Sequence, residues 1–366
     1  MRPSHHAPLP DRDVLLSALN GLLERHHLPR CDALDGAGID ADTYNPVVAA
    51  RAGARRYAVK VKARFTPFLR SDLDAVNAVI RATDLPIPAH LCCTEPHDPL
   101  PLLVMEWAAG SSFKAQIPAL PPGQVRDVFT EWGACMGRYH RAHAAVPGLE
   151  LQQPAATQQW WRDMAYGSLR GAHWDDAQRA QITHYLEPRF ATLATLAAPG
   201  LVKADDEPHD VLVDGEPRRI SALIDWERIQ LGDTACAVGC VYLRLRMMGL
   251  ISLWPYFLAG YGRDGSLPPQ CPQVEAVLMS RALRAAENQR AGVELVGELL
   301  AGRRLPFGGG SVADSSTPTW RRNKFRNRRP VPETAACGKF WERERRASPT
   351  FHASAETRSS AISADR

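Results

Sequence analysis

The chain has 366 residues, 45% of them hydrophobic, which is enough length and apolar content for two domains with buried cores. Its net charge of +4 is unevenly spread, because residues 309–366 hold twelve Lys or Arg against six Asp or Glu, a net +6, which leaves −2 for residues 1–308. This distribution excludes nucleic-acid binding by the protein as a whole and confines the basic excess to one segment.

The eight cysteines are scattered, with no Cys-x-x-Cys pair and no His pair at zinc-ligand spacing beside them. We interpret them as reduced thiols, with neither a zinc site nor a disulfide framework. The N-terminus has no apolar run before a small-residue cleavage site, so a cytoplasmic location is expected. Residues 235–261 are strongly apolar but include Arg244 and Arg246, and they predict buried helix rather than a membrane span.

The first third of the chain alternates between helical and β-type patterns. Apolar residues at helical spacing predict helices, and short β-type runs around a Gly-containing turn predict a hairpin. Two prolines within residues 84–91 end the helix that precedes them and enforce an extended segment. In order, we expect an amphipathic helix (11–28), a hairpin (43–50 and 55–63), a helix (71–82), the extended segment (84–91) and a buried strand (101–110).

From Pro121 onward the pattern is mainly helical, with one interruption. Helical spacing extends over residues 123–146, 156–166 and 175–197, and returns after about residue 234 until about Leu300. Between them, "LVKADDEPHDVLVDG" begins an acidic segment that leads into two short strands about an Asp-Gly turn, within residues 211–227. His140 and His143 lie three apart, but no acidic or Cys partner is near them, so they are expected to pack or hydrogen-bond rather than bind metal.

These elements predict a two-lobed α+β architecture. The N-terminal lobe is expected over residues 1–107 and the larger, mainly helical C-lobe over residues 108–308. Residues 309–366 are rich in Ser, Pro, Gly and Arg without a sustained period, and predict a disordered basic tail. Two other readings of the tail stay open: a basic arm for nucleic acid with interspersed aromatic residues, or a segment that arose by a shifted reading frame or fusion.

Three carboxylates have the spacing that phosphoryl transfer requires. That reaction needs one carboxylate to orient the acceptor hydroxyl and take its proton, and others to hold the Mg²⁺ bound to the nucleotide phosphates. Asp205 and Asp210 are five residues apart, and Asp225 ends the next apolar strand in "ALIDWE". A single Asp in a turn can be explained by the preference of Asp for turns. Three Asp residues at these spacings favour a catalytic site.

These segments resemble the aminoglycoside phosphotransferase family of small-molecule kinases, which have the protein-kinase-like fold. The family's catalytic segment reads HGDxHxxN, followed by an apolar strand, IDW/F-[ED] and a GD-P/T element. Here "KADDEPHDVLVDG" and "LIDWERIQLGDTACAV" match in register, and the resemblance extends over about residues 34–261. It implies that Asp205 is catalytic, that Asp210 and Asp225 bind Mg²⁺, and that Asp233 is chiefly structural.

The acidic segment departs from that pattern at four positions. Lys203 and Ala204 replace His-Gly, Glu207 replaces the second His, and Asp210 replaces Asn. A carboxylate suits Mg²⁺ as well as a carboxamide does. A cation at Lys203 is expected to lower the pKa of the Asp205 carboxyl, although positioning matters more than basicity in a loose transition state.

The resemblance also assigns the ATP contacts. In "YAVKV", Lys60 is expected to contact the α- and β-phosphates, although a solvent-facing strand lysine is the other reading of both Lys60 and Lys62. The family pairs this lysine with a Glu on the following helix, where only Asp72 and Asp74 are available, and Asp74 fits the spacing better.

Backbone groups are expected to complete the nucleotide site. Gly36 and Gly38 in "DGAGIDADTY" would allow a loop to approach the phosphates closely. The adenine is expected against the backbone of Met105, Glu106 and Trp107, on resemblance alone.

We therefore predict an ATP- and Mg²⁺-dependent phosphotransferase that moves the γ-phosphoryl group to a hydroxyl of a small molecule, such as an aminoglycoside-like compound, an amino alcohol or a sugar. The alternative is a catalytically impaired pseudokinase or nucleotide-binding module, because of the altered residues at 203 and 204 and the absence of the helix Glu. No membrane partner is expected, and nucleic acid only through the tail. The sequence leaves the oligomeric state open.

Overall fold

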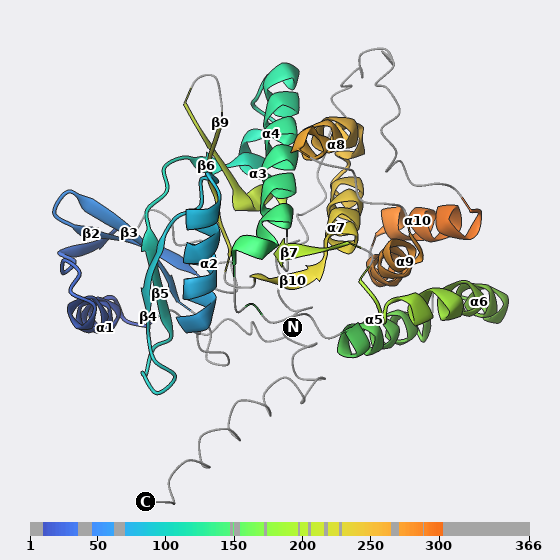
Figure 1. The fold of residues 1–366 in the computed structure, drawn as a ribbon, viewed down its shortest axis with the longest axis horizontal. Helices are drawn as coiled ribbons and strands as arrows, with labels where there is room; N and C mark the ends of the chain where they lie inside the picture. The colour runs from blue at the N-terminus through green and yellow to red at the C-terminus, as the bar shows by residue number, and fades with distance from the viewer. Residues whose placement is uncertain are drawn as a thin grey trace, which may run out of the picture. The chain divides into compact units, whose positions relative to one another are not determined.

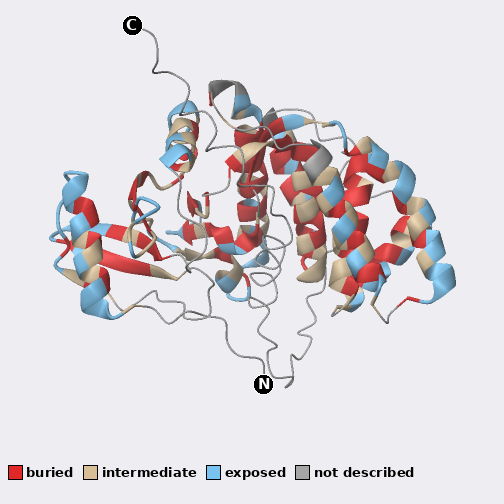
Figure 2. Cartoon of the chain, turned by 90° about the horizontal axis from the view of Figure 1, so that it is seen from below, coloured by how far each residue is buried: buried red, intermediate tan, exposed pale blue. Residues whose placement is uncertain are grey.

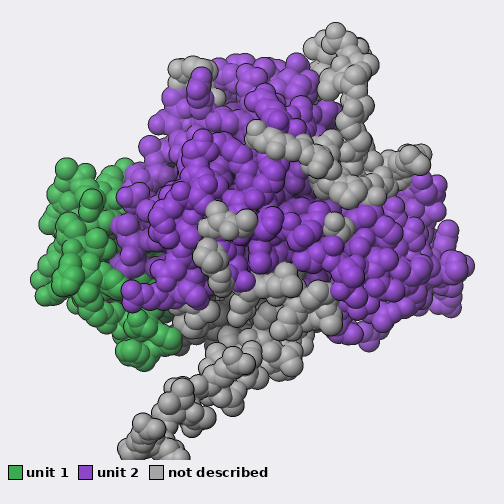
Figure 3. All heavy atoms as spheres, viewed as in Figure 1, with its two compact units in different colours: residues 1–68, 93–104, 320–366 green, residues 69–92, 105–319 purple. Residues whose placement is uncertain are grey.

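The computed structural model describes residues 10–35, 46–61, 70–146, 149, 154–171, 174–196, 198–203, 206–215, 219–226, 229–264, 271–287 and 289–302. The chain divides into two compact units (Figure 3). Unit 1 takes its described residues from 1–68 and 93–104, and unit 2 from 69–92 and 105–319. The basic tail predicted over 309–366 lies outside the described residues.

Unit 1 begins with the predicted amphipathic helix, α1 (Arg12–Arg25). The side chain of Asp11 caps it by accepting a hydrogen bond from the backbone N of Asp13 at 2.8 Å. Its buried face consists of leucines, which are Leu15, Leu19, Leu22 and Leu23. The helix therefore contributes one apolar stripe to the core of this unit.

The predicted hairpin is formed by β2 (Val47–Ala52) and β3 (Arg55–Val61), which pair antiparallel. Gly53 at the turn has φ +58°, a conformation that glycine adopts without cost. The five-stranded sheet has the order β1-β2-β3-β5-β4, with β1 at Ala33–Asp35, β4 at His90–Cys93 and β5 at Leu102–Glu106 (Figure 1). The strand predicted over 101–110 is confirmed as β5.

Unit 2 is mainly helical, as the sequence predicts, and several of its helices carry both buried and exposed residues (Figure 2). Its helices are α2 (Arg70–Ala82), α3 (Phe113–Gln116), α4 (Pro122–Arg141), α5 (Pro154–Leu169), α6 (Asp176–Thr192), α7 (Thr234–Met247), α8 (Trp254–Tyr261), α9 (Pro272–Ala286) and α10 (Arg290–Leu300).

Two small sheets interrupt the helices. The predicted hairpin about the Asp-Gly turn is β8 (Val211–Asp214) with β9 (Arg219–Leu223), and β6 (Ser111–Ser112) pairs with β8. A second pair, β7 (Pro199–Lys203) with β10 (Ile229–Asp233), was not predicted. The acidic segment therefore lies between two strands, β7 and β8, that belong to different sheets.

The most apolar segment forms buried helix, as predicted. It is divided between α7 and α8, and Arg246 makes a two-pronged ion pair with Glu298 of α10, with both N···O distances 2.7 Å. In the part of the chain that the structure describes, no helix is both long enough and apolar enough to cross a bilayer.

Glycines allow α4 and α8 to cross in backbone contact. A Cβ atom on Gly260 would lie 1.8 Å from the carbonyl oxygen of Thr130, and one on Gly133 would lie 2.0 Å from the carbonyl oxygen of Phe257. Neither helix backbone can move away from the other without disturbing the core that both helices cover, because protein interiors are close-packed.

We expect Gly260→Ala to lower the free energy of unfolding by about 3 kcal/mol, because the methyl group overpacks a backbone contact. Gly167 on α5 is the matched control, since no atom lies within 4 Å of the position of its added Cβ. Gly167→Ala should raise stability by about 0.5–1 kcal/mol through helix propensity. Urea denaturation of both variants measures the difference, and equal effects would contradict the close crossing.

Candidate active site

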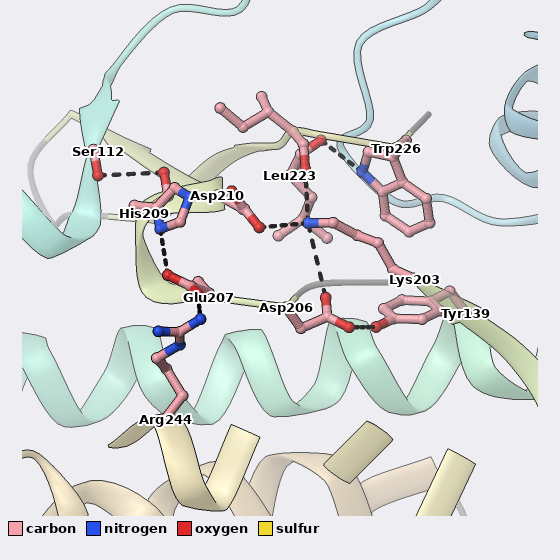
Figure 4. A network of polar contacts seen from close by, with 11 residues as sticks. Ser112, Tyr139, Lys203, Asp206, Glu207, His209, Asp210, Leu223, Trp226 and Arg244 are labelled. Carbon is pink, nitrogen blue, oxygen red and sulfur yellow. Dashed lines mark hydrogen bonds and ion pairs between the residues drawn. The ribbon is translucent and has the colours of Figure 1, made fainter. Parts of the chain in front are cut away.

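Backbone hydrogen bonds bring the acidic segment and the end of β9 together. The short 3₁₀ turn Pro208–Asp210 leads from the acidic segment into β8. The backbone N of Ile224, which directly precedes Asp225, donates to the carbonyl oxygen of Asp210 at 2.9 Å. Lys203, at the end of β7, reaches the same place with its side chain (Figure 4). The end of β7, the turn that leads into β8 and the residues after β9 thus contribute to one site.

The ammonium group of Lys203 lies at the centre of this site. Its Nζ donates to Asp210 Oδ2 at 2.7 Å and to the carbonyl oxygen of Ile224 at 2.9 Å, and Asp206 Oδ1 lies 3.9 Å away. Burial lowers the pKa of Lys203, but the charges of Asp210, Asp206 and Asp225 outweigh it and hold the pKa above its ordinary value. Lys203 is therefore a buried cation at neutral pH.

Tyr139 of α4 fixes the carboxylate of Asp206. Its hydroxyl donates to Asp206 Oδ2 at 2.7 Å, and its ring packs edge-on against Trp226, with centroids 5.1 Å apart. Burial, together with the Asp206 charge, raises the pKa of Tyr139 well above its ordinary value, so the phenol stays protonated and acts as a donor.

Glu207 and His209 form a second polar group beside the first (Figure 4). Glu207 is buried and forms an ion pair with Arg244 of α7. His209 Nδ1 lies 2.8 Å from Glu207 Oε2, and its Nε2 lies 3.0 Å from Asp210 Oδ1. Burial lowers the pKa of His209, but the hydrogen bond and charge of Asp210 hold it above the ordinary value. Both carboxylate oxygens of Asp210 therefore face nitrogen donors.

Asp225 has a backbone conformation that is rare for a residue with a side chain. Its φ is +69°, in the left-handed region, which Asp tolerates better than most residues and which concentrates at functional sites. The indole N–H of Trp226 donates to the carbonyl oxygen of Leu223 at 2.9 Å and so closes the turn around Asp225. The charge of Asp225 raises the pKa of both Lys203 and His209, so Asp225 belongs to the same site.

Asp233 has the structural role that the resemblance implies. Its Oδ1 accepts hydrogen bonds from the backbone N atoms of Ala235 at 3.0 Å and Cys236 at 3.4 Å, and so caps the N-terminus of α7. The cap fixes the direction in which α7 leaves β10, and α7 carries Arg244 to Glu207.

The structure places the other predicted residues as follows. Lys60 is buried on β3 in unit 1, opposite Val47, whereas Asp74 is exposed on α2 in unit 2. Glu106 ends β5, and its backbone N donates to the carbonyl oxygen of Ala89 at 2.9 Å. Its neighbours in the chain, Met105 and Trp107, are half-buried. As nucleotide contacts, these residues stay predictions.

Three of the predicted residues, Asp205, Gly36 and Gly38, lie outside the described residues, as does Lys62. Asp205 stands in the chain between Lys203 and Asp206, which are both described and both belong to the site. The assignment of Asp205 as the catalytic residue stays a prediction.

Sequence reasoning missed Tyr139, Asp206 and Arg244. Tyr139 and Arg244 lie far along the chain from the acidic segment, and nothing in their local pattern distinguishes them from other helix residues. The usable signal was Glu207, a carboxylate at a position where the family pattern has His. A carboxylate that is buried there needs a cationic partner, but the sequence could not identify that partner as Arg244.

His140 packs and hydrogen-bonds, as predicted. It is buried on α4, and its Nδ1 lies 2.8 Å from the hydroxyl oxygen of Tyr261, whereas His143 is exposed. Burial lowers the pKa of His140 to about 3, with a smaller contribution from the charge of Arg141.

This burial predicts acid sensitivity. The unfolded chain takes up a proton at His140 below about pH 6.5, whereas the folded protein does not until about pH 3, so stability is lost as the pH falls between these values. We expect His140 to contribute a loss of about 2 kcal/mol between pH 6.5 and 5. Urea denaturation at both values should show a shallower pH dependence in His140→Asn, and no change of slope in the control His143→Asn.

The carboxylates differ in how well they fit a magnesium ion. Magnesium that is bound with nucleotide phosphates is held by one or two protein carboxylates. Asp225 is half-buried on a turn at the end of a strand and fits this role. Asp210 fits less well, because Lys203 and His209 already contact its two oxygens. Among the described residues, no group of three or more His, Cys, Asp or Glu could hold a metal ion.

Residues 35–276 match the sequence model of the phosphotransferase enzyme family. The matched region contains the acidic segment, Lys203 and Asp225. No curated protein matches the sequence.

Solved structures of aminoglycoside phosphotransferases are similar to this chain. One from Ralstonia eutropha JMP134 is 12% identical, with a TM-score of 0.51, over 78% of this chain and 94% of that one. A thermostable mutant of APH(4)-Ia in complex with ADP and hygromycin B is 17% identical, with a TM-score of 0.52, over 82% and 99%. A mutant of aminoglycoside 2′-phosphotransferase IIIa in complex with GDP is 13% identical, with a TM-score of 0.52, over 80% and 98%. At these identities the likeness shows the fold, the two-lobed, protein-kinase-like α+β fold predicted from the sequence.

Proposed function

This chain belongs to the phosphotransferase enzyme family, and we propose that it transfers the γ-phosphoryl group of ATP to a hydroxyl group of a small molecule. The observation that carries the proposal is that Asp210 and the turn that holds Asp225 meet around the buried ammonium group of Lys203. A solvated turn alone would not require the ends of two strands to converge on a buried cation.

The proposed roles follow from the demands of phosphoryl transfer. Asp205 orients the acceptor hydroxyl and accepts its proton as the phosphoryl group moves. Asp225 holds the Mg²⁺, which neutralises charge on the phosphates when it is bound with the nucleotide. Asp210 was predicted as a second metal ligand, but its two oxygens already contact Lys203 and His209. The proposed nucleotide contacts are Lys60, Asp74, Gly36, Gly38 and the backbone of Met105, Glu106 and Trp107.

The acceptor class is proposed from the similar structures. Hygromycin B is bound with ADP in one of them, and another binds GDP. An aminoglycoside-like compound, an amino alcohol or a sugar, each with a hydroxyl nucleophile, is the proposed acceptor here. ATP is the proposed donor, and GTP is the alternative to test beside it.

A coupled ADP-release assay tests this function. The purified protein with Mg-ATP should release ADP when one member of a panel of aminoglycosides, amino alcohols, sugars and nucleosides is added. Mass spectrometry of that acceptor should show one added phosphate. If no acceptor stimulates ADP release although Mg-ATP binds, the phosphotransferase proposal fails.

One observation favours a second function, a nucleotide-binding pseudokinase. The ion pair between Lys203 and Asp210 places an ammonium group against the carboxylate that was predicted to bind a metal ion. A protein that binds nucleotide without turnover could tolerate this change. The ADP-release assay separates the two functions, because only the enzyme consumes ATP in the presence of acceptor.

The phosphate contact proposed for Lys60 can be tested by mutation. Lys60→Ala should weaken ATP binding about tenfold or more, the scale of a lost charge-assisted contact, whereas Lys62→Ala should change it little. Isothermal titration calorimetry with Mg-ATP measures both constants. The reverse pattern would assign the phosphate contact to Lys62.

A further inference from the structure

The departures from the family pattern at positions 203 and 210 are in direct contact. Lys203 stands where the pattern has His, and Asp210 stands where it has Asn, and their side chains are joined at 2.7 Å. A neutral pair has become an oppositely charged pair, so the sum of the two charges is unchanged. The two changes are therefore coupled in space, although they lie seven residues apart in the chain.

The Lys203 ammonium is surrounded by oxygen atoms. It contacts Asp210 Oδ2 and the carbonyl oxygen of Ile224 at 2.7 and 2.9 Å, with Asp206 Oδ1 at 3.9 Å, and its side chain is only 4% exposed. Carboxylate and carbonyl oxygens are also what a magnesium ion would take as ligands. The other oxygen of Asp210 faces His209 Nε2 at 3.0 Å.

In protein kinases, two magnesium ions are held by an Asp and an Asn, at the positions that Asp225 and Asp210 occupy in the family pattern. We propose that Lys203 supplies the positive charge at Asp210 in place of one of them, so that this protein binds its nucleotide with a single divalent cation, held at Asp225. This inference rests on the proposed function, because it concerns the metal content of the nucleotide complex.

Two physical arguments support it. A divalent cation bound to Asp210 would lie close to a buried ammonium group, and like charges repel strongly where water is excluded. Lys203 also donates to the carbonyl oxygen of Ile224, and the N–H of Ile224 donates to the carbonyl oxygen of Asp210, so both backbone polar groups of the residue before Asp225 are held. Lys203 is thus a positioning residue for Asp225 as well as a counter-charge for Asp210.

Electron paramagnetic resonance of Mn²⁺ counts the ions in the complex. With saturating AMP-PNP, the wild-type protein should bind one Mn²⁺ per nucleotide complex. Lys203→Met leaves the Asp210 carboxylate without its ammonium partner and should bind two. Lys203→Arg keeps the charge and should still bind one. Two ions in the wild type, or one in a folded Lys203→Met variant, would overturn the inference.

A titration without nucleotide separates this inference from the proposed function. Mn²⁺ alone should bind Lys203→Met at least about tenfold more tightly than the wild type, because the number of free carboxylate charges sets the affinity for such ions. Adding Asp210→Asn to Lys203→Met should abolish that gain and, by removing both buried charges, should keep the protein folded. Equal Mn²⁺ affinities in all three proteins would refute the inference, whether or not nucleotide binds.

Discussion

Asp205→Asn should leave ATP affinity within a few-fold of the wild-type value and should lower kcat by roughly 10²-fold or more, the scale of a positioned general base. The reason is that Asp205 is proposed to act on the acceptor hydroxyl, which enters the reaction after the nucleotide has bound. An amide keeps the size of the side chain but cannot take the proton. ATP titration and ADP release with the identified acceptor measure the two effects.

Asp225→Asn is the contrasting variant, because its carboxylate is proposed to hold the metal. It should weaken ATP binding in the presence of Mg²⁺ and change binding little when Mg²⁺ is absent. Loss of Mg²⁺-dependent ATP binding in Asp205→Asn would contradict the role proposed for Asp205. Unchanged Mg²⁺-dependent binding in Asp225→Asn would contradict the role proposed for Asp225. If Asp205→Asn turned over ATP at the wild-type rate, the catalytic assignment would be wrong.

Arg244→Met should lower the free energy of unfolding by about 3 kcal/mol, because it leaves the buried carboxylate of Glu207 without its cationic partner. The Glu207 side chain is 8% exposed and that of Arg244 is 19% exposed. His209, which also contacts Glu207, is half-exposed and replaces only part of the lost interaction. Chemical denaturation of the variant measures the loss.

The matched control is Arg290→Met on α10. Arg290 pairs with Glu294 at 2.8 Å, but its side chain is 91% exposed, and exposed pairs contribute little. The free energy of unfolding of Arg290→Met should differ from that of the wild type by less than about 0.5 kcal/mol. Adding Glu207→Gln to Arg244→Met should recover part of the loss, since the buried charge is then removed. If both single variants lost equal stability, Arg244 and Glu207 would not form a buried ion pair.

The sequence predicted the elements with strong periodicity. The helix over 71–82, the hairpin with Lys60 and the hairpin that precedes Asp225 are confirmed because each has a clear apolar period or a turn signal. The pair of β7 and β10 was missed. Each has five residues, and their pairing joins segments that begin thirty residues apart, at Pro199 and Ile229, so no local turn signal marks it.

The sequence predicted two of the carboxylates in the site but not the contacts between its residues. The spacing of Asp210 and Asp225 predicted that they act together, and the structure brings them to one place, while their roles as metal ligands stay predictions. The sequence did not predict that Lys203 pairs with Asp210. It predicted an effect of Lys203 on the pKa of Asp205, because Asp205 is only two residues away in the chain. Side-chain contacts between residues of different elements depend on the packing of those elements, which periodicity does not define.

The central claim is that this protein moves a phosphoryl group to a hydroxyl. The most direct measurement is a single-turnover reaction with γ-labelled ATP and the acceptor found by ADP release, carried out with the wild type and with Asp205→Asn. The label should appear on the acceptor with the wild-type protein, and its transfer should be slower by roughly 10²-fold or more with Asp205→Asn. Label that stays on ATP with the wild type, although ATP binds, would contradict the claim and leave a nucleotide-binding pseudokinase.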